Sequence, residues 1–460
     1  MIFNLDTTDP SGIAFVDDQS NILTYGELVL FIKKNSDLLP KRSLVFILGD
    51  NTTPVASFFC ACIENRWVPL LLNKDIDNSL LQVYLEKYKP QAVFTSNKHH
   101  FEKEVLLEWD DYKLYDNQED PIALYDELSL LLPTSGSTGS PKLVRHSYHN
   151  LSFSAKSVSQ FYNLLPTDVG LALLPLYYTM GLSIIMSHLQ VGAKVVLTNY
   201  ALTDRNFWNL LKEEKITVLT GVPYTFEVLF KMRFERVSLP SLRIITQGGG
   251  KLSENLWNAL IAFSESKNVE FVATYGQTEG TARMAFLDSA LAKSKQGSIG
   301  KSIPGGSFEV WDENDLPLTN MEVMGQLVYK GGNVTLGYAE NNDDLLLGDV
   351  RHGILKTGDV VKRDDEGYLF IVGRMKRFLK IYGLRISLDE TELLIKNKFN
   401  IECYAAGDDD LLKIYVTDST ILSEIKPWLS NTINLFHQAI EVICIEEIKR
   451  NSSGKIIFNQ

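Results

Sequence analysis

The chain is poor in cysteine and histidine. Its 460 residues include four cysteines and seven histidines, and no two cysteines form a Cys-x-x-Cys pair. This scarcity disfavours a disulfide-stapled fold and a zinc site, whereas buried free thiols in a reducing compartment fit the pattern. We therefore expect a cytoplasmic protein with buried thiols. The four cysteines are Cys60, Cys62, Cys403 and Cys444.

Long apolar runs are also missing. The most apolar long stretch, residues 171–186, is interrupted by Pro175, Thr179 and Gly181, whereas a membrane-spanning helix needs about 20 apolar residues. We interpret the stretch as a buried strand followed by the start of a helix. The first ten residues show no positive start followed by an apolar segment, so we expect neither a signal peptide nor a membrane span.

Positive charge is in deficit. The chain has 45 Lys and Arg residues against 57 Asp and Glu residues, a net charge of −12. Such a surface repels phosphate backbones, which disfavours nucleic acid as a partner, and a nucleotide site would need local positive groups and backbone N–H donors. The content of 45% hydrophobic and 22% charged residues is ordinary for a globular protein. A chain of this length predicts two domains.

Short β-rich apolar runs alternate with helical patterns through the first part of the chain. This alternation predicts an α/β fold in which helices lie on the faces of sheets. Two capping boxes, Thr24 with Glu27 and Ser387 with Glu390, mark helix starts. The predicted strands are 44–48, 92–95, 128–132, 170–174, 194–197, 218–220, 242–246 and 271–274, and the predicted helices are 54–64, 149–162, 207–214, 224–231 and 253–266.

The pattern changes after Gly297, where short strands are separated by turns. A hairpin-like turn at 364–368 (DDEGY) lies among them. Beyond Arg374 the pattern is that of a small α+β unit, so we predict a domain boundary near Lys376, with domains at 1–375 and 376–460. The predicted strands are 325–329, 367–372, 379–381, 402–405, 412–416 and 441–445, and the predicted helices are 388–398 and 422–432.

A loop rich in glycine and hydroxyl residues follows the strand predicted at 128–132. It reads Thr134-Ser-Gly-Ser-Thr-Gly-Ser-Pro-Lys142. Its backbone N–H groups and hydroxyls can surround phosphate oxygens, and Lys142 adds a positive charge. The separation of Gly136 and Gly139 is too short for the Walker pattern, which disfavours kinase or GTPase chemistry. A plain surface loop is the alternative.

Two further motifs carry carboxylates. The first, Tyr275-Gly-Gln-Thr-Glu279, follows an apolar strand, where α/β folds place ligands. Its aromatic ring can stack on a base, Thr278 can contact a phosphate oxygen, and Glu279 can bind Mg²⁺ through oxygen. In the second, Thr357-Gly-Asp359, a buried carboxylate after a tight turn could bind ribose hydroxyls. The alternatives are an ordinary strand-to-helix turn and an Asx-type turn.

The last two motifs are basic. Five positive residues fall between Arg374 and Arg385, and Ser452-Ser-Gly-Lys455 lies near the end of the sequence. A lysine beside a glycine could reach into a site on another domain. The alternatives are a solvated basic loop and a frayed polar tail.

The five motifs, in this order and at these separations, resemble the superfamily of AMP-dependent synthetases and ligases, which contains acyl-CoA synthetases, peptide-synthetase adenylation domains and luciferases. The stretches 24–28 (TYGEL) and 325–338 (GQLVYKGGNVTLGY) are also similar, and the resemblance covers nearly the whole chain. It implies a large N-terminal domain of layered β-sheets with packed helices and a β-barrel-like subdomain. A small, mobile α+β C-terminal domain would follow.

The resemblance also implies roles for individual residues, with ATP and Mg²⁺ as cofactors. The β- and γ-phosphates would be held by Thr134, Ser135, Gly136, Ser137, Thr138, Gly139 and Lys142. The remaining nucleotide contacts would come from Gly248, Gly249, Tyr275, Gly276, Gln277, Asp359 and Arg374, with Tyr275 on the adenine and Asp359 and Arg374 at the ribose. Glu279 would bind the metal and Thr278 the α-phosphate. Lys376 would be the domain hinge and Lys455 the catalytic lysine.

The implied activity is a two-step ligase reaction. A carboxylic acid would be activated to an acyl-adenylate with release of pyrophosphate, and the acyl group would then pass to the thiol of CoA or of a carrier protein's phosphopantetheine. Peptide-synthetase domains have an Asp where this chain has Thr179, which disfavours an α-amino acid and favours a plain or hydroxylated acid. Alternatively, Thr179 only packs, and another acidic residue pairs with the α-ammonium group. The expected acyl-pocket residues are Tyr178, Thr179, Ser183, Val222 and Gln247.

Smaller departures bear on the acceptor and the pathway. Lys449 stands where a proline is usual, and the short small domain weakly favours an acyl carrier protein over CoA. The stretches 181–189, 221–227 and 246–252 are similar to relatives linked to acylation of surface-polysaccharide amino sugars. Two alternatives remain open: a luciferase-like oxidase of an acyl-adenylate, and a nucleotide-binding protein without turnover.

Overall fold

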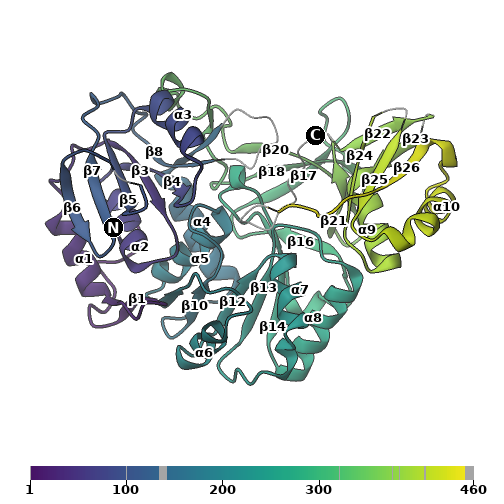
Figure 1. The fold of residues 1–460 in the computed structure, drawn as a ribbon, viewed down its shortest axis with the longest axis horizontal. Coiled ribbons are helices and arrows are strands. Elements are labelled where there is room, and N and C mark those ends of the chain that lie inside the picture. The colour runs from purple at the N-terminus through teal and green to yellow at the C-terminus, as the bar shows by residue number, and fades with distance from the viewer. Residues whose placement is uncertain are drawn as a thin grey trace.

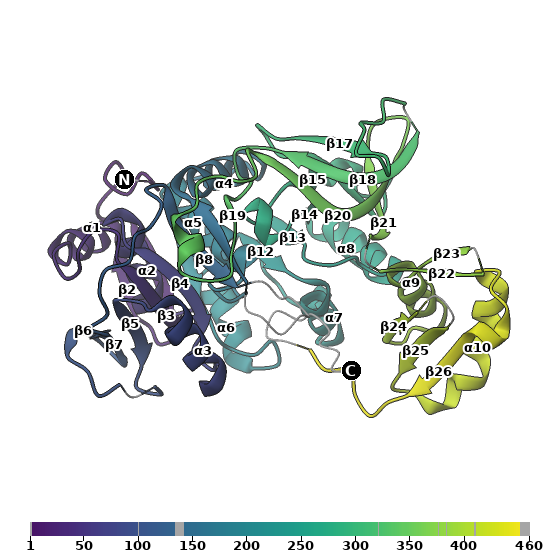
Figure 2. The ribbon, with the colours of Figure 1, turned by 90° about the horizontal axis from the view of Figure 1, so that it is seen from above.

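The computed structural model describes residues 2–99, 101–133, 142–320, 322–375, 377–382, 384–408 and 411–450. The larger part contains two β-sheets with helices between and around them. A smaller lobe, formed by the last part of the chain, lies at one end (Figures 1 and 2).

One sheet has eight strands and forms much of the N-terminal part. Its central strands β8, β4, β3 and β5 are parallel, and β9 returns antiparallel to β8. In spatial order the strands are β19 (Gly337–Ala339), β9 (Leu143–Ser147), β8 (Leu128–Pro133), β4 (Val68–Asn73), β3 (Leu44–Gly49), β5 (Ala92–Ser96), β7 (Tyr112–Asp116) and β6 (Val105–Trp109).

The other sheet has thirteen strands. It is parallel from β14 to β1 and antiparallel from β14 onward toward β17. In spatial order the strands are β17 (Ser307–Trp311), β18 (Val323–Lys330), β20 (Ile354–Arg363), β21 (Leu369–Arg374), β16 (Ser298–Ser302), β15 (Ala285–Leu287), β14 (Glu270–Tyr275), β13 (Ile244–Gln247), β12 (Val218–Gly221), β10 (Val169–Ala172), β11 (Lys194–Leu197), β1 (Ile13–Asp17) and β2 (Ile22–Thr24).

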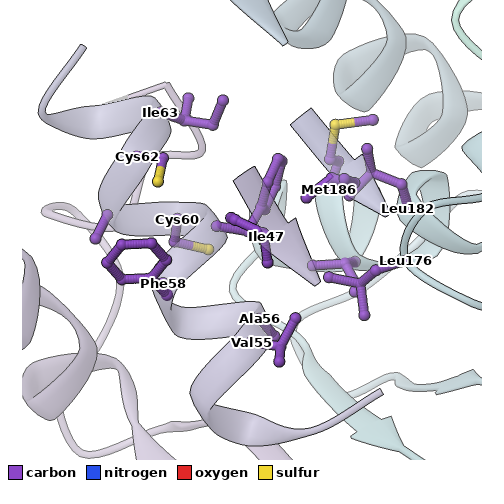
Figure 3. Close-up of a cluster of buried hydrophobic side chains, with 14 of the residues drawn as sticks. Ile47, Val55, Ala56, Phe58, Cys60, Cys62, Ile63, Leu176, Leu182 and Met186 are labelled. Atoms are coloured by element: carbon purple, nitrogen blue, oxygen red, sulfur yellow. The ribbon is translucent and has the colours of Figure 1, made fainter. Parts of the chain in front are cut away.

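Helices separate and cover the sheets because side chains alternate between the two faces of each strand. On β3, Val45 and Ile47 join the core between the sheets, while Phe46 joins the core on the opposite face. Figure 3 shows Ile47 beside side chains of α2, with Leu182 and Met186 of α5 close by. The inner helices are α1 (Tyr25–Lys34), α2 (Thr53–Glu64), α4 (Tyr148–Phe161) and α5 (Thr179–Gln190); the outer ones are α3 (Asn78–Tyr88) on the smaller sheet and α6 (Arg205–Glu213), α7 (Pro223–Lys231) and α8 (Glu254–Lys267) on the larger.

The small lobe has its own hydrophobic core. Ile395, Ile414 and Leu429 are fully buried there, and each comes from a different element. The elements are β22 (Phe378–Ile381), β23 (Leu384–Ser387), α9 (Leu388–Phe399), β24 (Cys403–Gly407), β25 (Leu412–Val416), α10 (Leu422–Thr432) and β26 (Ile440–Cys444). Six 3₁₀ turns complete the described elements: η1 (Phe234–Arg236), η2 (Thr278–Gly280), η3 (Ser289–Leu291), η4 (Asp343–Leu346), η5 (Ser419–Ile421) and η6 (His437–Ala439).

The predicted α/β fold, with a large sheet-based part and a smaller C-terminal one, is confirmed. Each predicted strand and helix overlaps an observed one, and the Thr24–Glu27 capping box forms in both directions. The barrel-like subdomain corresponds to an open antiparallel extension of the large sheet, which ends at β17. The expectation of buried thiols is wrong for Cys444, which is exposed. No described helix is long and apolar enough to cross a membrane.

Candidate active site

Several predicted site residues lie where neighbouring parallel strands end. Strands β12, β13 and β14 run parallel, and Gly221 pairs with Gln247 at their carboxyl ends. Val222, Gly248 and the segment Gly276–Glu279 directly follow these three strands. Because the carboxyl ends of parallel strands meet at one edge of a sheet, this is the expected place for a ligand.

The turn after β13 requires glycine. A Cβ on Gly248 would lie 2.6 Å from the Thr274 hydroxyl oxygen, and a Cβ on Gly249, whose φ is +77°, would lie 2.6 Å from the Tyr178 hydroxyl. The Gln247 amide donates to the carbonyl of Gly250 at 2.6 Å and so holds this turn. The turn can therefore pass close to the first residues of α5, whereas the Gln247 side chain is engaged with the backbone.

The expected acyl-pocket residues lie together at this turn. Tyr178 and Val222 pack in one cluster with Leu174 and Met180, and the Gly249 Cα is close to both. We call Tyr178, Thr179, Ser183, Val222 and Gln247 the acyl site. Ser183 donates its hydroxyl to the Met180 carbonyl at 2.7 Å, and the Thr179 and Thr278 hydroxyl oxygens are 3.1 Å apart. Position 179, which faces the Tyr275–Glu279 motif, therefore presents a hydroxyl group and not a carboxylate.

Asp359 links the first and second carboxylate motifs. Its side chain is 6% exposed, accepts a hydrogen bond from the Tyr275 hydroxyl, and lies 3.3 Å from Nε of Arg374. Burial raises the pKa of the Asp359 carboxyl, and the Arg374 charge opposes this rise. Asp359 lies within β20 and not after a tight turn as predicted, and a φ of +75° at Gly358 bends the strand beside it. A buried acceptor with a nearby cation suits paired hydroxyl groups.

Glu279 is oriented by a residue far along the chain. The Tyr338 hydroxyl donates to a Glu279 carboxylate oxygen at 2.7 Å, and the Arg351 guanidinium lies 4.6 Å from the centre of the Tyr338 ring. Burial and the Glu279 charge raise the pKa of Tyr338 to about 12, so the phenol stays a donor at neutral pH. No group of three or more potential metal ligands occurs among the described residues. One oriented carboxylate fits Mg²⁺, which takes few protein ligands and completes its shell with water and phosphate oxygens.

The glycine–serine loop 134–139 lies outside the described residues, but the strands on either side of it are clear. Strands β8 and β9 pair up to Pro133 and Leu143, so both ends of the loop are anchored at the same end of this strand pair. Lys142 forms a half-exposed ion pair with Glu340, with 2.6 Å between nitrogen and oxygen. A solvent-screened pair of this kind is weak, so it leaves Lys142 available to a phosphate.

The basic cluster after Arg374 divides by role. Arg377 pairs with Glu392 at 2.6 Å and Asp389 at 2.7 Å, and it donates to the Ala405 carbonyl. Arg377 therefore stabilises the small lobe and is not presented to a ligand. The predicted hinge residue Lys376 is outside the described residues.

The predicted catalytic residue Lys455 is also outside the described residues, but the chain just before it is placed. The Arg450 guanidinium lies 5.5 Å from the centre of the Tyr224 ring, in the first turn of α7, and pairs with Glu402. Tyr224 follows Val222 of the acyl site by two residues. A second contact between the lobes is the ion pair of Lys396 with Glu227.

Sequence reasoning missed two residues of this region. Tyr338 ends the stretch 325–338 but was not predicted as a site residue. A tyrosine directly after a glycine is the sequence signal that could have identified it. Arg283 follows the Tyr275–Glu279 motif by four residues and is 1% exposed. A lone charge in an otherwise apolar segment, ARMAF, is the signal that could have identified it.

Solved structures of adenylate-forming enzymes share this two-lobed fold. The o-succinylbenzoate CoA synthetase MenE from Bacillus subtilis, in complex with its acyl-adenylate intermediate, superimposes with a TM-score of 0.81 at 20% identity, covering 99% of this chain and 96% of that one. An anthranilate CoA ligase in complex with anthranoyl-AMP gives 0.79 at 18% identity, with 99% and 94% covered. At these identities the likeness establishes the fold.

The sequence matches the AMP-binding enzyme family over residues 6–339, and the chain belongs to this family. Similar proteins include the 2-succinylbenzoate–CoA ligases of Oceanobacillus iheyensis, 25% identical over 98% of this chain and 95% of the relative, and of Listeria monocytogenes, 24% identical over 91% and 88%. The interpretation of the sequence as an adenylate-forming acid–thiol ligase is confirmed at the level of enzyme class.

Proposed function

We propose that the protein activates a carboxylic acid with ATP as an acyl-adenylate, releases pyrophosphate, and transfers the acyl group to a thiol with release of AMP. The observation that carries this proposal is the buried Asp359 carboxylate, bonded to Tyr275 and close to Arg374. It gives the ends of the parallel strands an acceptor for ribose hydroxyls, in a chain of the AMP-binding family.

The nucleotide would lie across the carboxyl ends of β13 and β14. Asp359 would accept hydrogen bonds from the ribose hydroxyls, with Arg374 keeping the carboxylate ionised, and the Tyr275 ring would stack on the base. Their proximity supports these roles. The phosphates would extend toward the loop between β8 and β9. We assign the phosphate contacts to Thr134, Ser135, Gly136, Ser137, Thr138, Gly139, Lys142 and Thr278, and further nucleotide contacts to Gly248, Gly249, Gly276 and Gln277.

Glu279 would hold the Mg²⁺ ion, and a solved structure of the B. subtilis synthetase contains ATP and a magnesium ion. When bound, the ion neutralises phosphate charge and so eases the approach of the substrate carboxylate. Tyr338 keeps the Glu279 carboxylate in one orientation through its 2.7 Å hydrogen bond. The chain's own contribution is thus an oriented carboxylate oxygen ligand.

Lys455 would supply the positive charge for the first step. A carboxylate and a triphosphate repel each other, so attack on the α-phosphate needs a cation near the entering and departing oxygens. The contact of Arg450 with Tyr224 in the first turn of α7 supports this role, because Lys455 follows Arg450 by five positions and α7 adjoins the acyl site. Pyrophosphate exchange tests the assignment.

We expect Lys455→Ala to lose exchange by at least about 100-fold, since removing one transition-state charge costs several kcal/mol. Lys449→Ala is the matched control, because Lys449 is an exposed lysine of the same tail that pairs only loosely with Glu447, at 3.7 Å. Equal exchange in both variants would remove Lys455 from the mechanism.

Two domains, 1–375 and 376–460, would move about Lys376 between the two half-reactions. The separate hydrophobic core of the small lobe supports this division. Lys376→Pro fixes φ at the hinge, so it should reduce thioester formation while sparing pyrophosphate exchange. A proline at Lys398 is unsuitable as a control for the hinge variant, because Lys398 lies inside α9 and proline there would break the helix. Equal loss of both half-reactions would contradict a hinge at this position.

The thiol that accepts the acyl group and the carboxylic acid that is activated are identified by separate experiments. CoA is the acceptor in the named relatives, and an acyl carrier protein is the alternative suggested by the short C-terminal part; measuring AMP release with each thiol distinguishes them. Thr179 supports an acid without an α-ammonium group. A role in acylating surface-polysaccharide amino sugars and a cytoplasmic location stay predictions. Oxygen consumption or light emission would instead indicate a luciferase-like oxidase, and ATP binding without exchange a non-catalytic protein.

A further inference from the structure

Arg283 carries a buried charge without an ionic partner. The residue is 1% exposed, and its buried Nη2 atom has no hydrogen-bond acceptor among the described residues. Among the described residues no carboxylate lies within ion-pair distance of it. A buried charge without a partner costs several kcal/mol, so a protein keeps one only where something offsets the cost.

The acceptors that Arg283 does have are hydroxyl groups with other commitments. Nη1 donates to Thr274 and, at 3.4 Å, to Thr246, while Nε lies 3.5 Å from the Ser183 hydroxyl. Thr274 itself donates to the Gln247 carbonyl, Ser183 donates to the Met180 carbonyl, and Thr246 bonds with the Tyr162 hydroxyl. The Tyr162 ring centre also lies 5.8 Å from the guanidinium carbon. These neutral groups solvate part of the guanidinium, and none of them carries a counter-charge.

The guanidinium adjoins the acyl site. Ser183 belongs to that site, and the Thr274 hydroxyl is the atom that a Cβ on Gly248 would meet at 2.6 Å. Arg283 also acts on Tyr178: burial raises the pKa of this phenol and the Arg283 charge lowers it. The charge is therefore within electrostatic range of two acyl-site residues, Ser183 in α5 and Tyr178 just before it, and its hydroxyl acceptors Thr246 and Thr274 lie on β13 and β14.

The backbone before Arg283 is held in a costly conformation. Thr281 and Ala282 both have positive φ, 45° and 76°, although neither is glycine. The Asn333 side-chain amide donates to the Arg283 carbonyl at 2.8 Å, and Thr281 donates to the Asn333 carbonyl at 2.7 Å, which fixes the segment. Consecutive strained residues kept by such bonds are typical of functional positions.

We propose that the acid substrate carries a second carboxylate, which binds Arg283 at the inner end of the acyl site. The first carboxylate would react with ATP, and the second would take the position facing Nη2. This proposal rests on the adenylation reaction proposed above and adds the class of acid: a dicarboxylic acid. A hydroxyl at that position would leave the charge unpaired, so a hydroxylated monoacid does not meet the requirement.

The test compares dicarboxylic acids with their monomethyl esters, which keep the length and lose the second charge. Linear and aromatic pairs are assayed by pyrophosphate exchange with the wild type, Arg283→Met and Arg283→Lys. We expect the wild type to prefer each accepted diacid over its ester by about 30-fold to 1000-fold in kcat/KM, the range for loss of one partner of a buried charge pair. Arg283→Met should lose this preference and still activate the ester, while Arg283→Lys should keep part of it.

The outcomes separate the two proposals. A wild type that activates esters or hydroxylated monoacids as well as diacids, or an Arg283→Met variant that keeps the preference, overturns the dicarboxylic acid while leaving adenylation standing. Absence of exchange with every diacid, ester and monoacid overturns the adenylation proposal and this inference together. Thermal melting of each variant establishes that it is folded.

Discussion

Two buried arginines allow the cost of an unpaired charge to be measured inside one protein. Arg145 and Arg283 are both almost fully buried, at 0% and 1% exposure. The Arg145 guanidinium donates to backbone carbonyls, among them those of Tyr338 at 3.0 Å, Leu336 at 3.2 Å and Gly348 at 3.3 Å, whereas Arg283 has hydroxyl acceptors and an orphaned Nη2. Replacing each by methionine, which has a similar length, removes the charge and keeps the packing.

The expected changes in stability have opposite signs. Arg145→Met removes a hydrogen-bond donor from several backbone carbonyls at about 1–3 kcal/mol each where no other donor replaces it, so we expect a loss of roughly 3–5 kcal/mol in the free energy of unfolding. Arg283→Met leaves hydroxyls that already have other partners, and it removes a buried charge that has no carboxylate partner among the described residues. Replacement of buried ionic groups by apolar ones is neutral or stabilising by about 1–4 kcal/mol, so Arg283→Met should melt at or above the wild-type temperature.

Thermal melting at neutral pH, followed by far-UV circular dichroism, measures both effects. For large domains about 1 kcal/mol corresponds to a shift of about 2 °C, so the two variants should differ by roughly 6 °C or more. A dicarboxylic acid should raise the melting temperature of the wild type and have no effect on Arg283→Met. If Arg283→Met melts as low as Arg145→Met, the Arg283 guanidinium is a structural group and the reasoning from its orphaned nitrogen is wrong.

Three further predictions concern the nucleotide and metal contacts. Tyr338→Phe removes the hydrogen bond to Glu279, so the Mg²⁺ concentration for half-maximal exchange should rise roughly tenfold, the equivalent of about 1.4 kcal/mol; an unchanged Mg²⁺ dependence would count against Glu279 as the ligand. Because burial raises the pKa of Asp359 and Arg374 lowers it, ATP binding should weaken as pH falls through that pKa, and Arg374→Gln should move this loss to higher pH; identical profiles of ATP Kd against pH would contradict the pairing. Gly276→Ala places a Cβ 1.6 Å from a backbone oxygen of the next loop, so we expect it to abolish ATP binding or folding, and normal ATP affinity would be inconsistent with the observed turn.

The order of strands and helices could be read from the sequence because it depends on local periodicity and on end signals. The strand predicted at 412–416 and the helix predicted at 422–432 match β25 and α10, and the Thr24–Glu27 capping box forms as expected. Elements with weaker patterns, such as the β6–β7 hairpin, were not predicted. The predicted tight turn at Thr357–Asp359 is a bent strand, because pairing with β21 outweighs the local turn preference of this sequence.

The motifs alone determined the family, because residue types at fixed separations can be recognised in the sequence without knowledge of the fold. Only the tertiary structure decided which of those residues meet. Asp359 accepts a hydrogen bond from Tyr275, and Glu279 accepts one from Tyr338. Arg377 forms an ion pair with Glu392 within the small lobe. The structure was likewise needed to show that Arg283 is buried and has no counterion among the described residues. The physical reason is that burial and pairing depend on contacts between residues distant in sequence, whereas periodicity and motif spacing are properties of the chain itself.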